Sequence, residues 1–151
     1  CYSIDVACAS SLAALHTCIM TLREGTSCEE GLGIGTKVLS EAVNYATSVA
    51  GMTSARGRCH TFDQRADGYC RGEGCGAFLV RSKASAGVEV LGSDVQQDGP
   101  SASLTAPNGS SQRRLIESVS RAIADKNGVS SLEAHGTGTA LGDPIEVCYY
   151  S

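Results

Sequence analysis

The sequence predicts a layered α/β domain, because segments with strand character alternate with segments of helical period and one apolar run is typical of a buried strand. Ser3 to Ala7 is predicted as a short buried strand, and from Ala9 to Arg23 apolar residues recur every three or four positions, which indicates a helix. Residues 77–80, Ala-Phe-Leu-Val, form a continuous apolar run typical of a strand with both faces covered. Such alternation favours helices packed on a sheet.

The other elements are predicted from the residues at their boundaries. Ser40 is a favourable helix N-cap and Gly51 a favourable stop, so a helix is expected between them. Asp143-Pro144 is typical of a helix start, and Gly25 of a helix end. We further expect a functional loop over 52–73, a helix over 112–125, a turn at 127–128, and strands at 31–35 (close to another backbone), 76–81, 88–95 and 129–134.

The composition is that of one globular domain with a core: 151 residues, 42% hydrophobic and 19% charged. A net charge of −4 with scattered basic residues argues against nucleic acid as a partner. No apolar run reaches the roughly 18 residues of a membrane span, so no membrane partner is expected. The chain begins at Cys1 without an initiator Met or a secretory signal pattern, which indicates an excised piece or a missing leader, and not a secreted protein.

Eight cysteines require an explanation. They form no Cys-x-x-Cys pair and have no histidine at zinc-site spacing, so no metal site is predicted. We expect most of them to be small buried apolar residues in a reducing compartment, such as the cytoplasm or a plastid, and one to be a nucleophile. A non-enzymatic redox or zinc module remains the competing hypothesis, and the absence of paired spacing argues against it. The eight are Cys1, Cys8, Cys18, Cys28, Cys59, Cys70, Cys75 and Cys148.

Cys8 lies at the predicted corner between strand and helix. A helix N-terminus stabilises a thiolate through its unpaired N–H groups, and the same groups can donate to an oxyanion on a bound acyl carbonyl. The neighbours Ala7, Ala9, Ser10 and Ser11 are small, so a substrate could approach. The pattern alone equally allows Cys8 to be one more small packed residue.

Four blocks of sequence follow one another along nearly the whole chain. They are Ile-Asp-Val-Ala-Cys-Ala-Ser-Ser-Leu at 4–12; Gly-Arg-Cys-His-Thr-Phe-Asp and Ala-Asp-Gly-Tyr-Cys-Arg-Gly-Glu-Gly within 57–74; Gln-Asp-Gly and Leu-Thr-Ala-Pro-Asn-Gly within 97–109; and Glu-Ala-His-Gly-Thr-Gly-Thr with Leu-Gly-Asp-Pro-Ile-Glu within 133–146. In this order they resemble the β-ketoacyl synthase, or ketosynthase, domain of type I and modular polyketide synthases.

The resemblance implies a thiolase-like layered α/β/α fold of which residues 1–151 form the N-terminal half and the start of the second half, with the C-terminal part missing. Cys8 would be the catalytic nucleophile that takes up an acyl chain, and His135 would stabilise the enolate formed when a malonyl-type extender loses carbon dioxide. Thr137 and Thr139 match positions that bind the pantetheine arm. Substrates would arrive on the phosphopantetheine of an acyl carrier protein, with no cofactor bound directly, and the ketosynthase would form a homodimer.

The resemblance also has gaps. Val6 and Ala9 stand where the family usually has Thr and Ser. The family's second catalytic histidine, its lysine and a glycine-rich segment would follow Ser151, so we expect the isolated chain not to catalyse condensation, and its stability stays open. Two related functions stay open: a fatty acid synthase ketosynthase, and a non-elongating or thiolase-like acyltransferase.

Overall fold

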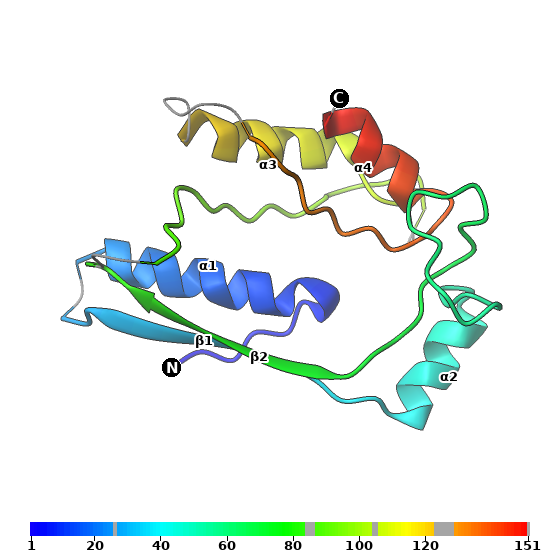
Figure 1. The fold of residues 1–151 in the computed structure, drawn as a ribbon, viewed down its shortest axis with the longest axis horizontal. Helices are drawn as coiled ribbons and strands as arrows, with labels where there is room; N and C mark the ends of the chain where they lie inside the picture. The colour runs from blue at the N-terminus through cyan, green and yellow to red at the C-terminus, as the bar shows by residue number, and fades with distance from the viewer. Residues whose placement is uncertain (26, 84–86, 104–105, 123–128, 151) are drawn as a thin grey trace. The chain divides into compact units, whose positions relative to one another are not determined.

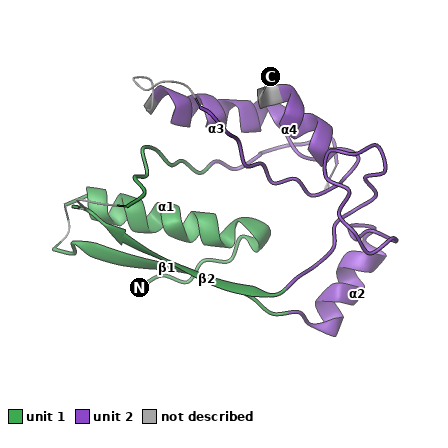
Figure 2. Cartoon of the chain, viewed as in Figure 1, with its two compact units in different colours: residues 1–38, 73–95 green, residues 39–72, 96–151 purple. Residues whose placement is uncertain are grey.

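The computed structural model of the chain describes residues 1–25, 27–83, 87–103, 106–122 and 129–150 (Figure 1). The chain divides into two compact units, which Figure 2 colours separately. Both units are discontinuous in sequence, because the chain leaves the first after Val38 and returns to it at Glu73. Unit 1 comprises Cys1–Val38 and Glu73–Val95, and unit 2 comprises Leu39–Gly72 and Gln96–Ser151.

Unit 1 is a helix packed on a two-stranded antiparallel sheet (Figure 1). A 3₁₀ turn, Ala7–Ala9, leads into α1 (Ser10–Arg23), which confirms the helix predicted there. Gly25 then adopts φ +72°, a conformation that suits glycine after a helix end. The sheet pairs β1 (Glu30–Lys37) with β2 (Gly74–Arg81), so the expected strands at 31–35 and 76–81 are both present.

Glycine is required in β1 because α1 lies directly against it, as the sequence predicted. A Cβ atom at Gly35 would lie 2.6 Å from the Cβ of Ser11, and one at Gly33 would lie 3.7 Å from the Cα of Leu15. At Gly31 a Cβ would overlap the sulfur of Cys18. The alternate glycines thus form a smooth strip on which the helix rests.

The prediction that residues 77–80 are buried on both faces is wrong. Leu79 is 57% exposed, and its cross-strand partner Leu32 is 59% exposed. The strand register places Ile34 opposite Ala77 on the same face, and Ile34 is 52% exposed. Cross-strand partners share a face, so this is the side of the sheet opposite to α1, and no second layer covers it among the described residues of unit 1.

Three expected strands are absent from the described residues. Residues 3–6, 88–95 and 129–134 have no regular structure and pair with no other strand there, and Ala7 belongs to the 3₁₀ turn before α1. Extended backbone forms a strand only when a neighbouring strand takes up its N–H and C=O groups, which an apolar pattern cannot guarantee. The predicted turn at 127–128 and the end of the helix over 112–125 lie outside the described residues.

Unit 2 contains three helices among its described residues. The first, α2 (Glu41–Val49), begins after Ser40, whose Oγ accepts the N–H of Val43 at 3.4 Å, and it is followed by Gly51 at φ +67°. Both predicted boundary residues are thus confirmed. Residues 52–73 form the expected irregular loop, in which Thr53 and Tyr69 make an isolated bridge.

Helix α3 (Gly109–Ala122) begins three residues earlier than predicted, because Asn108 caps it. The Oδ1 of Asn108 accepts the N–H of Ser111 at 3.1 Å, and its Nδ2 donates to the carbonyl oxygens of Asp98 and Pro100 at 2.9 and 3.0 Å. Helix α4 (Gly142–Tyr150) contacts α3 and starts where Asp143-Pro144 predicted. No helix within the described ranges is long and apolar enough to cross a membrane.

The packing of α1 on β1 can be tested by adding one methyl group. We expect Gly35→Ala to lower the free energy of unfolding by about 1–3 kcal/mol, because the new Cβ would collide with Ser11. Its cross-strand partner Gly76 has no atom within 4 Å of the equivalent position, which makes Gly76→Ala the matched control. Urea titration of both variants measures the difference, and equal stabilities would contradict the close approach of helix and strand.

Candidate active site

The thiol of Cys8 lies at the point where the chain enters α1. Cys8 is the middle residue of the turn Ala7–Ala9, and its thiol is free and exposed. The preceding residue, Ala7, has φ 55°, a left-handed conformation that costs a non-glycine residue about 1–2 kcal/mol. Such a cost persists only where surrounding contacts hold the backbone in place.

Two side chains hold this corner. The carboxylate of Asp5 accepts the N–H of Ala7 at 3.2 Å. The hydroxyl of Ser10 donates to the carbonyl of Ala7 at 2.7 Å and accepts the N–H of Val6 at 3.0 Å. Asp5 and Ser10 therefore fix the backbone on both sides of the Ala7 turn, a role that the sequence alone did not assign to them.

The backbone at the corner leaves a donor beside the sulfur. The N–H of Ala9 donates to the carbonyl of Val6 at 3.3 Å, and that of Ser10 donates to Ala7. The N–H of Cys8 donates to no acceptor among the described residues. An acyl carbonyl attached to this sulfur would therefore have a free N–H donor close by, as stabilisation of an oxyanion requires.

His135 lies in unit 2, at the start of a loop that a single carboxylate organises. Glu146, in α4, accepts the N–H of His135 at 2.9 Å with Oε1 and that of Gly136 at 2.8 Å with Oε2. Gly136 turns at φ 57°, and its carbonyl accepts the hydroxyl of Thr61 at 2.7 Å. His135 itself is exposed, so its imidazole is accessible while its backbone is fixed.

A second carboxylate, that of Asp143, joins the same loop to the loop over 52–73. Asp143 is only 4% exposed. Its Oδ1 accepts the N–H of Gly138 at 3.0 Å, and its Oδ2 accepts the N–H of Phe62 at 2.6 Å. Because Asp143 lies in the first turn of α4, the N-terminal end of the helix also favours its negative charge.

The hydroxyls of Thr137 and Thr139 lie 3.0 Å apart, and that of Thr139 also accepts the N–H of Gly142 at 3.1 Å. Each hydroxyl has one hydrogen, and either atom can be the donor in their shared bond. One hydrogen is used between them, so one remains to donate to a ligand.

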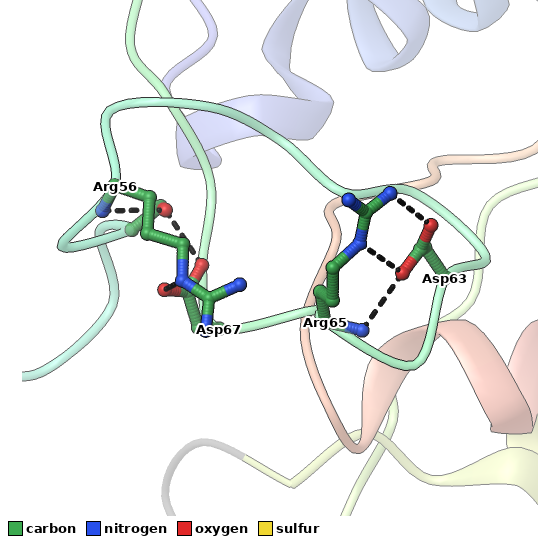
Figure 3. A network of polar contacts seen from close by, with 5 residues as sticks. Arg56, Asp63, Arg65 and Asp67 are labelled. Atoms are coloured by element: carbon green, nitrogen blue, oxygen red, sulfur yellow. Dashed lines mark hydrogen bonds and ion pairs between the residues drawn. The ribbon is translucent and has the colours of Figure 1, made fainter.

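The loop over 52–73 is stabilised by polar contacts of its own (Figure 3). Arg65 forms two side-chain hydrogen bonds to Asp63, at 2.9 and 2.7 Å, and these hold the pKa of the Asp63 carboxyl well below its usual range. Asp67 accepts the hydroxyl of Ser54 at 2.6 Å and lies 3.6 Å from the Nε of Arg56. This ordered loop contacts the His135 loop, since Gly68 donates its N–H to the carbonyl of Gly138 at 3.0 Å.

The structure places three of the four predicted site residues, His135, Thr137 and Thr139, in one loop of unit 2, whereas Cys8 belongs to unit 1. Sequence reasoning assigned Asp143 only a helix start and gave Glu146 no role. Their signal was present in the block at 141–146, which begins six positions after the histidine.

The expectation that most cysteines are buried is wrong. Cys18 and Cys59 are half-buried, and the other six are exposed. Among the described residues, no three His, Cys, Asp or Glu side chains gather as they would around a metal ion.

Comparison with known proteins assigns the family. Residues 1–86 match the model of the β-ketoacyl synthase N-terminal domain, and residues 88–149 match that of the C-terminal domain. The chain belongs to the β-ketoacyl synthase family. It is 43% identical to the polyketide synthase PksN of Bacillus subtilis and 42% identical to the erythronolide synthase EryA2 of Saccharopolyspora erythraea, with 95% of the chain aligned in each case.

The solved structures agree with this assignment. The ketosynthase from module 6 of the bacillaene synthase from Bacillus subtilis 168 superposes with a TM-score of 0.90 over 98% of the chain, at 32% identity. This confirms the predicted thiolase-like α/β fold. The chain spans 28% of that ketosynthase, 3% of PksN and 4% of EryA2.

The contact between Glu146 and the His135 loop predicts a local effect of mutation. Glu146→Gln removes the charge and turns an NH₂ group toward one of the two N–H donors, so we expect the amides of His135 and Gly136 to lose about 1.5–3 kcal/mol of protection. Hydrogen exchange of these amides measures the loss, about ten-fold or more in rate. Glu133→Gln, at an exposed residue before the same loop, is the control. Equal exchange in both variants would contradict the role of Glu146.

Proposed function

We propose that the chain is part of a ketosynthase that elongates acyl chains in polyketide biosynthesis by decarboxylative Claisen condensation. The observation that carries the proposal is the exposed Cys8 thiol at the start of α1, beside an N–H without an acceptor, in a β-ketoacyl synthase chain. Several of its relatives are named polyketide synthases, which favours this pathway over fatty acid synthesis.

The first step is acyl transfer to Cys8. Its thiolate attacks the carbonyl carbon of an acyl thioester, a sulfur–carbon bond forms, and the thiol of the donor leaves with a proton. The tetrahedral intermediate carries a negative oxygen, which the N–H of Cys8 can stabilise. The corner held by Asp5 and Ser10 keeps sulfur and donor in one arrangement.

The second step forms the carbon–carbon bond. A malonyl-type thioester loses carbon dioxide, the resulting enolate carbon attacks the Cys8 thioester, and the Cys8 thiolate leaves. The imidazole of His135 would donate a hydrogen bond to the enolate oxygen, which lowers the barrier to decarboxylation without a permanent charge. Glu146 fixes the backbone of His135 for this role.

Both substrates would arrive on the phosphopantetheine arm of an acyl carrier protein. This arm carries amide groups, and the one hydroxyl hydrogen left over between Thr137 and Thr139 fits a carbonyl oxygen of such an amide. We propose no cofactor bound by the chain itself, and a ketosynthase homodimer as the working assembly.

We further propose that residues 1–151 act within a larger ketosynthase domain. The exposed apolar face of the sheet, with Leu32, Ile34 and Leu79, supports this, because an isolated domain would bury such a face. In a complete domain this face would be covered by further secondary structure.

The nucleophile assignment is tested by acylation. After incubation with an acyl thioester, we expect the intact mass to increase by one acyl group, and Cys8→Ala to abolish the increase. Cys28→Ala is the matched control, since Cys28 is also an exposed free thiol of unit 1. Acylation that persists in Cys8→Ala would contradict the proposal.

The role of His135 separates elongation from simple acyl transfer. In the complete synthase that contains this chain, we expect His135→Ala to keep Cys8 acylation but to reduce carbon dioxide release from a malonyl thioester by about 10²–10³-fold. His16→Ala is the control, because His16 is bonded to Ser93 in unit 1 at 3.0 Å. If the unmodified synthase acylates Cys8 without releasing carbon dioxide, it is a non-elongating acyltransferase.

A further inference from the structure

Two cysteines of unit 2, eleven positions apart in sequence, are neighbours in space. The sulfur of Cys59 accepts the N–H of Cys70 at 3.0 Å and lies 3.9 Å from the carbonyl oxygen of Cys70. An N–Cα bond is about 1.46 Å long, so the Cys59 sulfur lies within about 4.5 Å of the Cys70 Cα. Neither thiol takes part in the proposed condensation.

This placement is compatible with a disulfide. A disulfide requires Cα atoms no more than about 7 Å apart. The Cys59 sulfur is two bonds from its own Cα and 3.0 Å from the backbone nitrogen of Cys70, which places the two Cα atoms near this limit or closer. Cys70 is exposed, so its side chain has room to rotate toward Cys59, which is half-buried.

The backbone on the Cys70 side is held in place. Tyr69 donates its N–H to the carbonyl of Met52 at 3.2 Å and accepts the N–H of Ser54 at 3.0 Å. The backbone N–H of Cys70 therefore stays within hydrogen-bond distance of the Cys59 sulfur without any rearrangement of the loop.

The pair lies against the loop that carries His135. A Cβ at Gly138 would lie 3.4 Å from the Cα of Cys59 and 2.9 Å from the N of His60. The N–H of Gly68, two residues before Cys70, donates to the carbonyl of Gly138 at 3.0 Å. A bond between Cys59 and Cys70 would thus close a ring that supports the Gly138 turn.

We propose that Cys59 and Cys70 are a redox-active pair that forms a reversible disulfide with a low-molecular-weight disulfide, such as oxidised glutathione, as the oxidant. The exposed Cys70 thiolate attacks the glutathione disulfide, whose S–S bond breaks, and one reduced glutathione leaves. The Cys59 thiolate then attacks the Cys70 sulfur and releases the second glutathione. The two cysteines lose two electrons and two protons, which the glutathione disulfide gains, and excess reduced glutathione reverses the reaction.

Trypsin makes the product unambiguous. It cleaves after Arg58, Arg65 and Arg71, which places Cys59 in peptide 59–65 and Cys70 in peptide 66–71, each with a single cysteine. We equilibrate the full chain with oxidised and reduced glutathione, alkylate the remaining thiols, digest, and identify cross-linked peptides by mass spectrometry. The expected product is peptide 59–65 joined to 66–71, from a chain about 2 Da lighter for the two hydrogens lost.

Matched conditions and variants show whether the fold directs the bond. In urea we expect the eight cysteines to pair without preference, and the 59–70 product to fall several-fold. Cys70→Ser and Cys59→Ser should abolish it, whereas Cys75→Ser, at an exposed cysteine of β2, should leave it unchanged. Hydrogen exchange at Gly68 should slow on oxidation and recover on reduction.

Three results would overturn the proposal. The first is a folded chain that keeps both thiols reduced while its other exposed cysteines become glutathionylated. The second is a mixed glutathione disulfide on Cys70 that Cys59 never resolves. The third is a 59–70 product no more abundant in the folded chain than in urea.

Discussion

Asp143 places a carboxylate between two loops far apart in sequence, where its two oxygens accept the N–H groups of Phe62 and Gly138. A buried carboxylate costs several kcal/mol unless hydrogen bonds replace its water. Here two backbone donors and the first turn of α4 do so. The converse also holds, because loss of the carboxylate would leave both N–H groups without their acceptor. The loop over 52–73, the His135 loop and α4 therefore hold their conformations together, and the candidate site in unit 2 depends on this one side chain.

The helices were predictable because their signals are local. Ser40 caps the helix that follows it through its hydroxyl, and Gly25 ends the helix before it through its backbone conformation. The strands were less predictable, because the stability of a strand depends on a partner strand that the local apolar pattern does not reveal. Residues 30–37 and 74–81 pair with each other across 36 intervening residues, whereas residues 88–95, also predicted as a strand, join no sheet among the described residues. Burial followed the same rule, since Leu79 has the expected apolar character but no layer over it.

In the candidate site, too, some residues could be predicted from local sequence and others could not. Cys8 and His135 could be proposed as the reactive groups from short blocks of sequence, because the blocks around them resemble those of ketosynthases. The function of Asp143 was not readable, because one of its partners, Phe62, lies 81 positions away. The sequence assigned it only its local role at the start of α4. The side chains that position a proposed reactive group contact backbone atoms far away in the sequence. A short motif can therefore indicate the reactive group but not the residues that hold it in place.

Side-chain hydrogen bonds to the backbone also offset the strain at two residues. The described residues contain two non-glycine residues with positive φ, Ala7 and Phe62, both at 55°. Each costs about 1–2 kcal/mol, and hydrogen bonds of about 1 kcal/mol each offset it, two at Ala7 from Asp5 and Ser10, and a charge-assisted one at Phe62 from Asp143. Glycine would remove the strain but would add backbone freedom that folding must then restrict. Alanine before Cys8 retains the strain, and the backbone on which the Cys8 sulfur and N–H are placed is thereby held in one conformation, as the proposed acyl transfer would require.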